Sequence, residues 1–163
     1  MAELARAGLV EVIALTEKIN ALARRIEVRL TQVAPTLLAM PGTGVLTAAK
    51  LVGEAAGVSR FKSEAAFARH AGIAPIPVWS ANTAGRVRLT RSGNRQIHTA
   101  IHRIAITQIR MDGLGKTYCE KEKAEGMSPP EALRCHKRRL ARIFFNHLTT
   151  DQATTAAYTT AAT

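Results

Sequence analysis

Cysteines and aromatic residues are scarce in this 163-residue chain, and their scarcity excludes several classes of protein. The two cysteines, Cys119 and Cys135, are too few and too unpatterned for a disulfide framework or a zinc site, so we interpret them as reduced thiols. Aromatic residues make up 4% of the sequence, so aliphatic side chains must fill the core. Alanine, leucine and isoleucine dominate, which favours a helix-rich fold.

Long apolar runs and export signals are also missing from the sequence. No run reaches the ~18 apolar residues that mark a transmembrane helix, so we expect no membrane partner. The first residues do not follow the basic-then-apolar pattern of a signal peptide. We therefore expect a cytoplasmic protein.

Acidic residues are outnumbered by basic ones, and the imbalance is uneven along the chain. The net charge is +11. Residues 85–143 contain fourteen Lys and Arg against five Asp and Glu, whereas residues 1–33 contain five and four. Such a surplus predicts a polyanionic partner, and nucleic acid is the leading candidate because each neutralised phosphate releases counterions. An anionic membrane surface is the weaker alternative, since no basic amphipathic helix carries an aromatic face.

Residues 3–33 lack proline and contain one glycine, which predicts one long helix. Its apolar residues alternate at spacings of four and three, with Arg29 at the one polar position of the seam: Leu15, Ile19, Leu22, Ile26 and Val33. This heptad pattern is typical of a coiled coil. We assign residues 1–34 to a coiled-coil or linker helix that forms a homo-oligomer through residues 12–33 or pairs with a missing domain. The alternative is a helix packed on its own domain.

The sequence predicts a domain over residues 35–148, which begins where Pro35 interrupts this helix. We expect two helices joined by a tight turn at residues 41–44, then a helix capped by Ser63 and ended by Gly72. A small β-hairpin, a long helix and a short charged helix follow. The expected hairpin covers residues 73–90 with its turn at 82–85, and the long helix opens at Ser92 or Gly93 and is ended by Gly113 and Gly115.

The last predicted helix starts at a capping box, residues 128–131. Its apolar stripe is expected to face the core (Leu133, Leu140, Ile143 and Phe144), and its basic residues are expected to point mostly outward (Arg134, Lys137, Arg138 and Arg142). No core pattern continues beyond Leu148, so we expect residues 149–163 to be a mobile tail. The fold class is therefore mainly α: a helix-hairpin-helix domain with a small β-hairpin, preceded by a coiled-coil-type helix.

The turn at residues 41–44, Pro-Gly-Thr-Gly between two apolar helices, has the pattern of a helix-hairpin-helix motif. Glycines allow a tight turn, and Gly42, Thr43 and Gly44 would then present backbone N–H groups at a helix N-terminus. Such a terminus binds a phosphate without reading a base. The alternative is an ordinary helix–helix turn that needs a glycine.

A serine precedes a run of arginines in the segment 77–96, "PVWSANTAGRVRLTRSGNRQ". Serine is a weak nucleophile unless its surroundings stabilise the charge that develops, and arginines can grip the oxygens of a phosphodiester. Ser80 is therefore a candidate nucleophile, with Arg86, Arg88, Arg91 and Arg95 as phosphate contacts. Residue types alone favour the simpler alternative, a turn serine in a basic loop that only binds the nucleic-acid backbone.

Metal chemistry has little support in the sequence. His98 and His102 are spaced for one helix face, but no third ligand is visible, so a phosphate contact or plain surface is the better interpretation. The acids Glu120, Glu122 and Glu125 lie among lysines and are typical of a solvated face. We predict no metal or cofactor bound by this chain.

Three segments and the serine between them match a known family. The segments "MPGTGVLTAAKLVGEAAGVSRFKSEAAFARHAGIAP", "GRVRLTRSGNRQIHTAIHRIA" and "RRLARIFFNHL" resemble the carboxy-terminal domain of bacterial insertion-sequence transposases of the one-ten group. The resemblance runs from about Leu37 to Leu148, and the order of its motifs is specific.

The resemblance implies a DNA recombinase that moves insertion sequences under the guidance of a structured bridge RNA. In this family a serine of the carboxy-terminal domain attacks DNA, and an RNase H-like amino-terminal domain holds Mg²⁺ with acidic residues. The family serine falls on Ser80. Glycines often follow it in the family, whereas Ala81, Asn82 and Thr83 follow here, so the loop differs.

We expect DNA, and a guide RNA, as partners. The expected DNA-binding residues are Gly42, Thr43, Gly44, Arg86, Arg88, Arg91, Asn94, Arg95 and Arg138. Because the acidic domain is missing from this sequence, we expect a fragment, a truncated copy or one half of a split enzyme, inactive without that domain and its Mg²⁺. The alternative is a non-catalytic nucleic-acid-binding module, or a degenerate remnant acting as a dimerising regulator.

Overall fold

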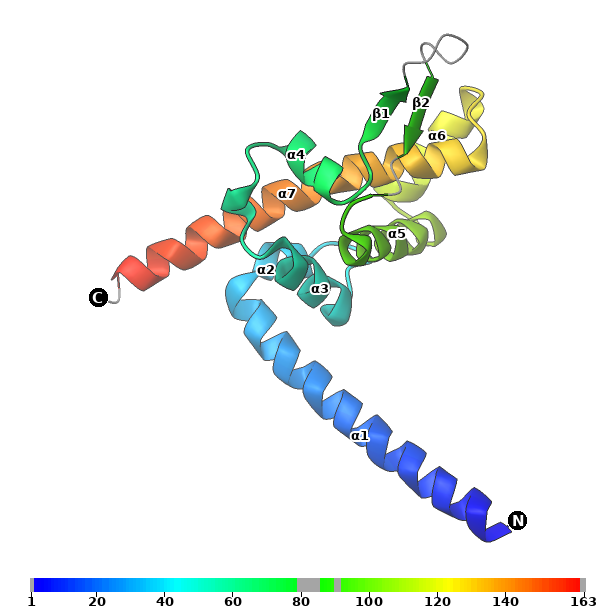
Figure 1. Ribbon diagram of the computed structural model, residues 1–163, viewed down its shortest axis with the longest axis vertical. Helices are drawn as coiled ribbons and strands as arrows, with labels where there is room; N and C mark the ends of the chain where they lie inside the picture. Colours follow the sequence, from blue (N-terminus) through cyan, green and yellow to red (C-terminus); the bar gives the residue numbers. More distant parts are fainter. Residues whose placement is uncertain (1, 79–85, 90–91, 162–163) are drawn as a thin grey trace.

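The fold is mainly α-helical in the computed structural model, which describes residues 2–78, 86–89 and 92–161 (Figure 1). Within these ranges the elements are α1 (Ala2–Val33), α2 (Pro35–Leu38), α3 (Val45–Ala55), the 3-10 helix η1 (Val58–Arg60), α4 (Glu64–His70), β1 (Pro75–Val78), β2 (Arg86–Leu89), α5 (Arg95–Arg110), α6 (Leu114–Ala124) and α7 (Pro129–Ala161). The predicted mainly α fold with one small hairpin is confirmed.

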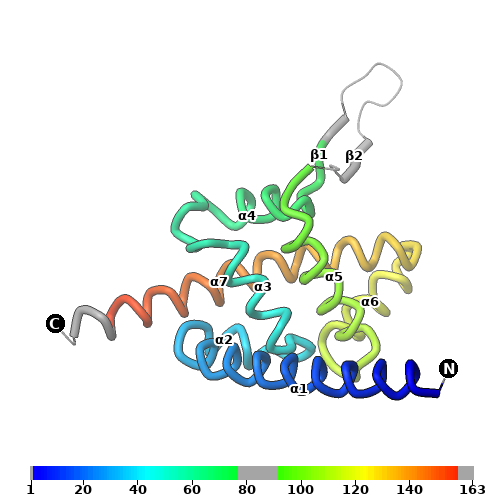
Figure 2. Tube along the Cα trace, turned by 60° about the horizontal axis from the view of Figure 1, so that its bottom comes forward, coloured from blue at the N-terminus to red at the C-terminus, as the bar shows by residue number. Residues whose placement is uncertain are grey.

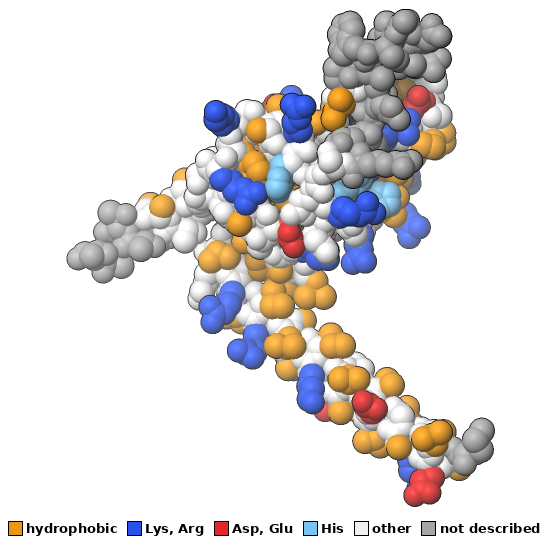
Figure 3. All heavy atoms as spheres, viewed as in Figure 1, with side chains coloured by type: hydrophobic (Ala, Val, Ile, Leu, Met, Phe, Trp, Pro, Cys, Tyr) orange, Lys and Arg blue, Asp and Glu red, His pale blue; other side chains and the backbone are white. Residues whose placement is uncertain are grey.

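Helix α1 extends away from the rest of the molecule in Figure 1, and in the turned view of Figure 2 it runs as one unbroken helix along the lower edge. Only its C-terminal end enters the core, through the buried side chain of Leu30. The apolar seam residues Leu15, Ile19 and Leu22 are 49%, 59% and 53% exposed, and hydrophobic side chains follow the length of the helix in Figure 3. The predicted long helix is confirmed, and its pairing with another helix stays a prediction.

The core lies between α2, α3, α4, α5 and α7 and is built mainly from aliphatic side chains. Phe67 of α4 and Phe144 of α7 are its largest fully buried residues. Helix α5 contributes one buried stripe that packs between α3 and α7: Ile97, Ala100, Ile101, Ile104 and Ala105. As predicted, Leu140 and Phe144 of α7 are buried and Ile143 is partly buried, so this face of α7 points inward.

The C-terminal segment, which the sequence predicts to be a mobile tail, is helical to Ala161 and contacts the core through Asp151. Helix α7 continues to Ala161, and Asp151 on it is 2% exposed. Its two carboxylate oxygens accept hydrogen bonds from the backbone N–H groups of Thr36 (3.1 Å) and Leu37 (3.2 Å) at the start of α2. No side chain of α2's own N-cap, Ala34, can do this. A distant carboxylate therefore caps α2.

The β-hairpin emerges from a close contact between two glycines. Strands β1 and β2 are antiparallel, with Pro75 opposite Leu89 and Val78 opposite Arg86. At its foot, a Cβ on Gly93 would lie 2.7 Å from the Gly72 nitrogen, and the φ of Gly93 is +109°. Only glycine fits this crossing without movement of the backbone.

Helix α5 begins one or two residues later than predicted. Its N-cap is Asn94, whose Oδ1 accepts hydrogen bonds from Gln96 N (2.9 Å) and Ile97 N (3.0 Å). The expectation that Ser92 or Gly93 opens the helix is wrong, because Gly93 is held in its contact with Gly72.

The far end of α5 also differs from the prediction. The helix ends at Arg110, and Gly115 lies inside the first turn of α6. A Cβ on Gly115 would lie 2.8 Å from Gln108 Cβ, so this glycine permits α6 to approach α5 closely. Our prediction that Gly115 helps to end α5 is therefore wrong.

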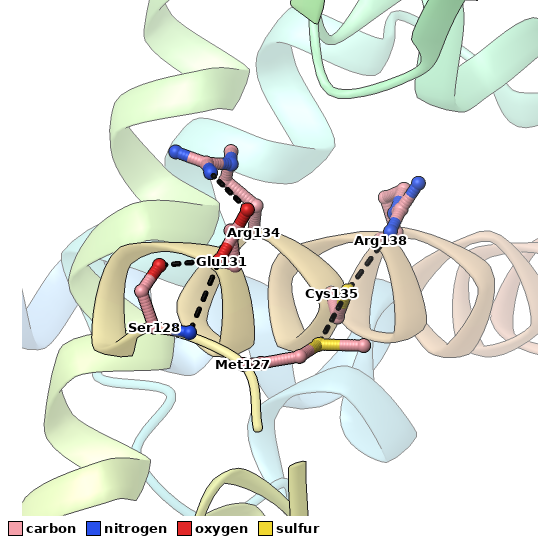
Figure 4. A network of polar contacts seen from close by, with 6 residues as sticks. All are labelled: Met127, Ser128, Glu131, Arg134, Cys135 and Arg138. Atoms are coloured by element: carbon pink, nitrogen blue, oxygen red, sulfur yellow. Dashed lines mark hydrogen bonds and ion pairs between the residues drawn. The ribbon is translucent and has the colours of Figure 1, made fainter. Parts of the chain in front are cut away.

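The predicted caps of α4 and α7 are confirmed. Ser63 Oγ accepts a hydrogen bond from Ala66 N at the start of α4. At the start of α7, Ser128 donates hydrogen bonds to the Glu131 carboxylate from its backbone N–H and its hydroxyl (Figure 4). The carboxylate reaches back to the N-terminal N–H as a capping box predicts, but the serine hydroxyl donates to the same carboxylate, and Glu131 N donates to Ser128 O (2.9 Å).

Candidate nucleic-acid interface

The turn between α2 and α3 is held in shape by α5. Gly42 has a φ of +77°, and a Cβ there would lie 3.1 Å from Gln108 Cγ. Gln108 Nε2 donates a hydrogen bond to Pro41 O (2.7 Å), and Thr43 N donates one to Met40 O (3.1 Å). The predicted tight turn is present, and its glycine is required by both conformation and space.

The N-terminus of α3 is open. Its N-cap, Gly44, has extended backbone angles, and no side chain caps the helix. The first N–H groups of a helix have no acceptor within it, and those of Val45 and Leu46 have none in the described part of the chain. Next to them, Thr43 Oγ1 is buried and has no hydrogen-bond partner within the described part of the chain. This terminus therefore offers hydrogen-bond donors to an anion.

A hollow of about 750 Å³ joins this helix terminus to α5. One wall consists of Gly42, Thr43, Gly44 and Thr47, and the other consists of His102, Arg103, Ile106 and Thr107. Backbone N–H groups thus stand opposite a histidine and an arginine. The hollow has hydrogen-bond donors on the α3 side and the charge of Arg103 on the α5 side, which suits an anionic ligand.

The wall formed by α5 belongs to a longer stripe on that helix, exposed except at the half-buried Ile106. Its members recur at helical spacing and are called the α5 stripe below: Arg95, Thr99, His102, Arg103, Ile106 and Arg110. Among the described residues, no carboxylate forms an ion pair with its three arginines. Lys, Arg and His side chains gather around the position of α5 in Figure 3. The stripe is a row of uncompensated positive charge.

The histidines of α5 respond to this charge. Burial lowers the pKa of His98, and the charges of Lys137, His102 and Arg95 lower it further. Burial and then Lys137 lower the pKa of His102. Both pKa values are therefore lowered first by burial, which disfavours the charged imidazole, and further by the neighbouring positive charges.

The predicted serine–arginine site lies largely outside the described residues. Ser80 and Arg91 are among the residues that the structure does not describe. Arg86 and Arg88 lie on strand β2, but their side chains are also outside the described part. The nucleophile and its predicted arginines therefore stay predictions.

Two other predicted DNA-binding residues make contacts within the chain. Asn94 uses Oδ1 to cap α5 and donates from Nδ2 to Glu54 Oε2 (2.7 Å). Arg138 is exposed on α7 and donates to Cys135 Sγ at 2.9 Å (Figure 4). Arg95, in contrast, lies exposed on the α5 stripe.

The prediction that Lys137 points outward is wrong. This residue is 7% exposed, and its Nζ lies 3.2 Å from His98 Nε2, because α7 packs against α5 at this residue. Sequence reasoning also missed Arg103 and Arg110 as candidate contacts. Helical spacing from Arg95 was the signal that could have found both, since residues 95, 103 and 110 share one face.

The described residues contain no group of three or more His, Cys, Asp or Glu that could hold a metal ion. Burial raises the pKa of the Cys119 thiol, which disfavours a reactive thiolate there. None of the described helices is long and apolar enough to cross a membrane.

Comparison with known proteins gives the family. The sequence model described as the IS116/IS110/IS902 transposase family matches residues 34–120. Three insertion-element proteins are similar: the 43.6 kDa protein of IS110 from Streptomyces coelicolor (32% identical over 111 residues), the 42 kDa protein of IS900 from Mycobacterium paratuberculosis (30% over 129) and the 44.8 kDa protein of IS116 from Streptomyces clavuligerus (28% over 137).

These alignments cover 68%, 76% and 83% of this chain but 27%, 32% and 34% of the three relatives. The chain thus spans about a third of the length of the relatives that it matches. The family match includes α2, the turn, α3, the hairpin strands and α5, which carry the candidate interface. Because that match covers 87 of 163 residues, the chain belongs to the IS116/IS110/IS902 transposase family.

Proposed function

We propose that this chain is the carboxy-terminal, DNA-binding part of a transposase and that nucleic acid binds along the α5 stripe. The observation that supports this most directly is the hollow in which the open N-terminus of α3 faces His102 and Arg103. Family membership adds that a protein of this kind acts on DNA. Phosphate oxygens are the ligand that N–H groups, guanidinium groups and a histidine can share.

The length of the stripe sets the extent of the proposed contact. Arg95 and Arg110 are fifteen residues apart on one helix, which is about 22 Å at ~1.5 Å per residue. That distance corresponds to about six nucleotide steps along one strand at ~3.4 Å each. Three arginines and the α3 terminus would contact roughly four phosphates, so the slope of log affinity against log salt for duplex DNA should be about −3 to −4.

We further propose that Ser80 supplies the nucleophile for strand cleavage, as the family resemblance implies. Its Oγ would bond to phosphorus while one P–O bond of the DNA strand breaks. Serine loses its proton, and the departing sugar oxygen gains one, so the number of phosphoester bonds is unchanged and the strand can be rejoined. The hairpin carries Arg86 and Arg88 on β2, which suits a site that must stabilise phosphate charge.

Magnesium does not fit the described part of this chain, which contains no cluster of three metal-ligating residues. We therefore assign no metal-dependent step to it. The resemblance places Mg²⁺ on an RNase H-like domain, and we propose that cleavage depends on such a companion domain and on a structured guide RNA.

A salt titration of binding tests the nucleic-acid proposal. The chain should bind a random-sequence DNA duplex with little sequence preference, and binding should weaken steeply with salt. The double variant Arg95→Gln/Arg103→Gln should reduce the salt slope by about two, because two phosphate contacts are lost. The matched control is Lys121→Gln/Lys123→Gln on α6, where Lys121 already pairs with Glu125 at 3.7 Å. A flat salt response in the unmodified chain would contradict the proposal.

A second candidate function, a dimerising regulator, is favoured by the exposed seam of α1. Leu15, Ile19 and Leu22 leave about half of their side-chain surface in water, and the helix has no partner over that stretch within the described chain. Apolar seams of this spacing pair with a second helix. We propose a homo-oligomer through residues 12–33, which could also compete with a full-length transposase for DNA.

A further inference from the structure

Lys137 is a buried cation that has no anionic partner among the described residues. It is 7% exposed, and the group recorded next to its ammonium is His98 Nε2 at 3.2 Å. No carboxylate in the described chain forms an ion pair with it, and the sequence has no Asp or Glu in residues 77–91 or 158–163. Burying a charge is costly unless an opposite charge or hydrogen bonds compensate for it.

The contact between Lys137 and His98 links the protonation of the two groups. While Lys137 is charged, its ammonium can only donate, so His98 Nε2 accepts and the imidazole is neutral, with its proton on Nδ1. Burial, followed by the charge of Arg134, lowers the pKa of Lys137. Burial and three positive neighbours lower the pKa of His98. The pair is therefore an electropositive centre, held together at the expense of stability.

Every element near this pair adds positive charge or hydrogen-bond donors, and acids are displaced from it. Helix α5 contributes Arg95 and His102, and α7 contributes Arg134. The Glu131 carboxylate lies 3.8 Å from Arg134 and bonds to Ser128, and Glu54 of α3 bonds to Asn94.

The position of the pair connects the α5 stripe to the hairpin. His98 Nδ1 lies 3.6 Å from the place that a Cβ on Gly72 would occupy, and Gly72 is at the foot of the hairpin. His102, one turn along α5, also lines the hollow at the α3 terminus. A nucleic-acid backbone that follows the α5 stripe toward the hairpin would therefore pass this centre.

We propose that Lys137 and His98, with Arg95 and His102 at the rim, form an anion site that takes one phosphate group of bound nucleic acid at the foot of the hairpin. This inference rests on the proposed nucleic-acid-binding function. Lys137 then supplies the local positive charge, and the phosphate supplies the anion that the folded chain lacks.

Proton uptake follows from this arrangement. When a phosphate binds, the Lys137 ammonium can donate to it in place of His98 Nε2, which frees that nitrogen to take a proton. The phosphate charge also favours the charged forms of both imidazoles, so binding raises pKa values that are low in the free chain. Between the free and bound pKa values the complex holds more protons, and affinity should rise as pH falls through that interval. His98→Gln should remove part of this pH dependence.

The variant Lys137→Met gives the decisive test, because function and stability should move in opposite directions. Affinity for a random-sequence DNA duplex should fall about tenfold or more, and the salt slope should lose about one unit. The melting temperature should stay unchanged or rise, since an uncompensated buried charge is removed. The matched control, Lys123→Met on α6, should alter neither quantity. Unchanged affinity combined with a lower melting temperature would show that Lys137 is only a packing residue and would overturn the proposal.

A second measurement uses the unmodified chain, so it tests the anion site even if Lys137→Met fails to fold. Inorganic phosphate added to the unmodified chain should shift the imidazole NMR resonances of His98 and raise its pKa. Absence of any shift at His98 overturns the anion site. The two proposals fail separately: a chain that binds no nucleic acid but shows the His98 shift retains the anion site and loses the proposed function. A chain that binds DNA equally well with Lys137→Met loses only the anion site.

Discussion

Replacing Asp151 by alanine should destabilise the chain more than its place near the C-terminus suggests. The carboxylate is 2% exposed and accepts hydrogen bonds from Thr36 N and Leu37 N. Alanine would leave the buried N–H of Leu37 and the part-buried N–H of Thr36 without this acceptor, at about 1–3 kcal/mol each, and would remove a negative charge from the positive end of α2. We expect a loss of about 2–5 kcal/mol, a large part of the ~5–15 kcal/mol that stabilises a typical domain.

Thermal and urea unfolding followed by circular dichroism would measure this loss. At about 2–4 °C per kcal/mol for a chain of this size, Asp151→Ala should lower the melting temperature by roughly 4–20 °C. Asp151→Asn, which keeps one oxygen acceptor, should have an intermediate effect. Thr150→Ala, at an exposed neighbouring position, is the matched control and should change little. An Asp151→Ala variant within ~0.5 kcal/mol of the unmodified chain would refute the reasoning, because water would then satisfy α2 equally well.

Three further predictions concern chemistry, assembly and pH. With a companion acidic domain and guide RNA supplied, Ser80→Ala should abolish a covalent DNA adduct detected by gel shift and mass spectrometry, whereas Ser92→Ala should retain it; the reverse pattern would place the nucleophile at Ser92. Ile19→Glu/Leu22→Glu should convert an oligomer into a monomer in analytical ultracentrifugation, and a monomeric unmodified chain at high concentration would argue against the seam. The lowered pKa of His98 means that the unfolded chain binds more protons, so stability should fall as pH drops below about 6.5; His98→Gln should reduce that fall in denaturant titrations at several pH values.

Local sequence signals predicted most helices and their caps. Ser63 and Ser128 cap their helices through groups within four residues, so residue type and spacing were sufficient. The turn at Gly42–Gly44 was predictable for the same reason. Residue 42 has a φ of +77°, a conformation that favours glycine, and the sequence has a glycine there. The hairpin strands followed from alternation between apolar and basic residues.

Errors arose where a residue's role depends on a distant part of the chain. Asn94 caps α5 because Gly93 packs against Gly72, which lies twenty-one residues earlier in the sequence. Gly115 was mistaken for a helix end, although it opens space for Gln108. No spacing rule within either helix contains that information.

The sequence by itself determined that this chain is helical, strongly basic and built around a glycine turn, because composition, periodicity and local hydrogen bonding act over a few residues. Tertiary structure alone decided that Lys137 is buried against His98 and that Asp151 caps α2. Both depend on how α7 packs across helices more than thirty residues away in sequence. A charged side chain in a helix looks the same in the sequence whether it faces water or a neighbour, and only the packing determines which charges must find a partner.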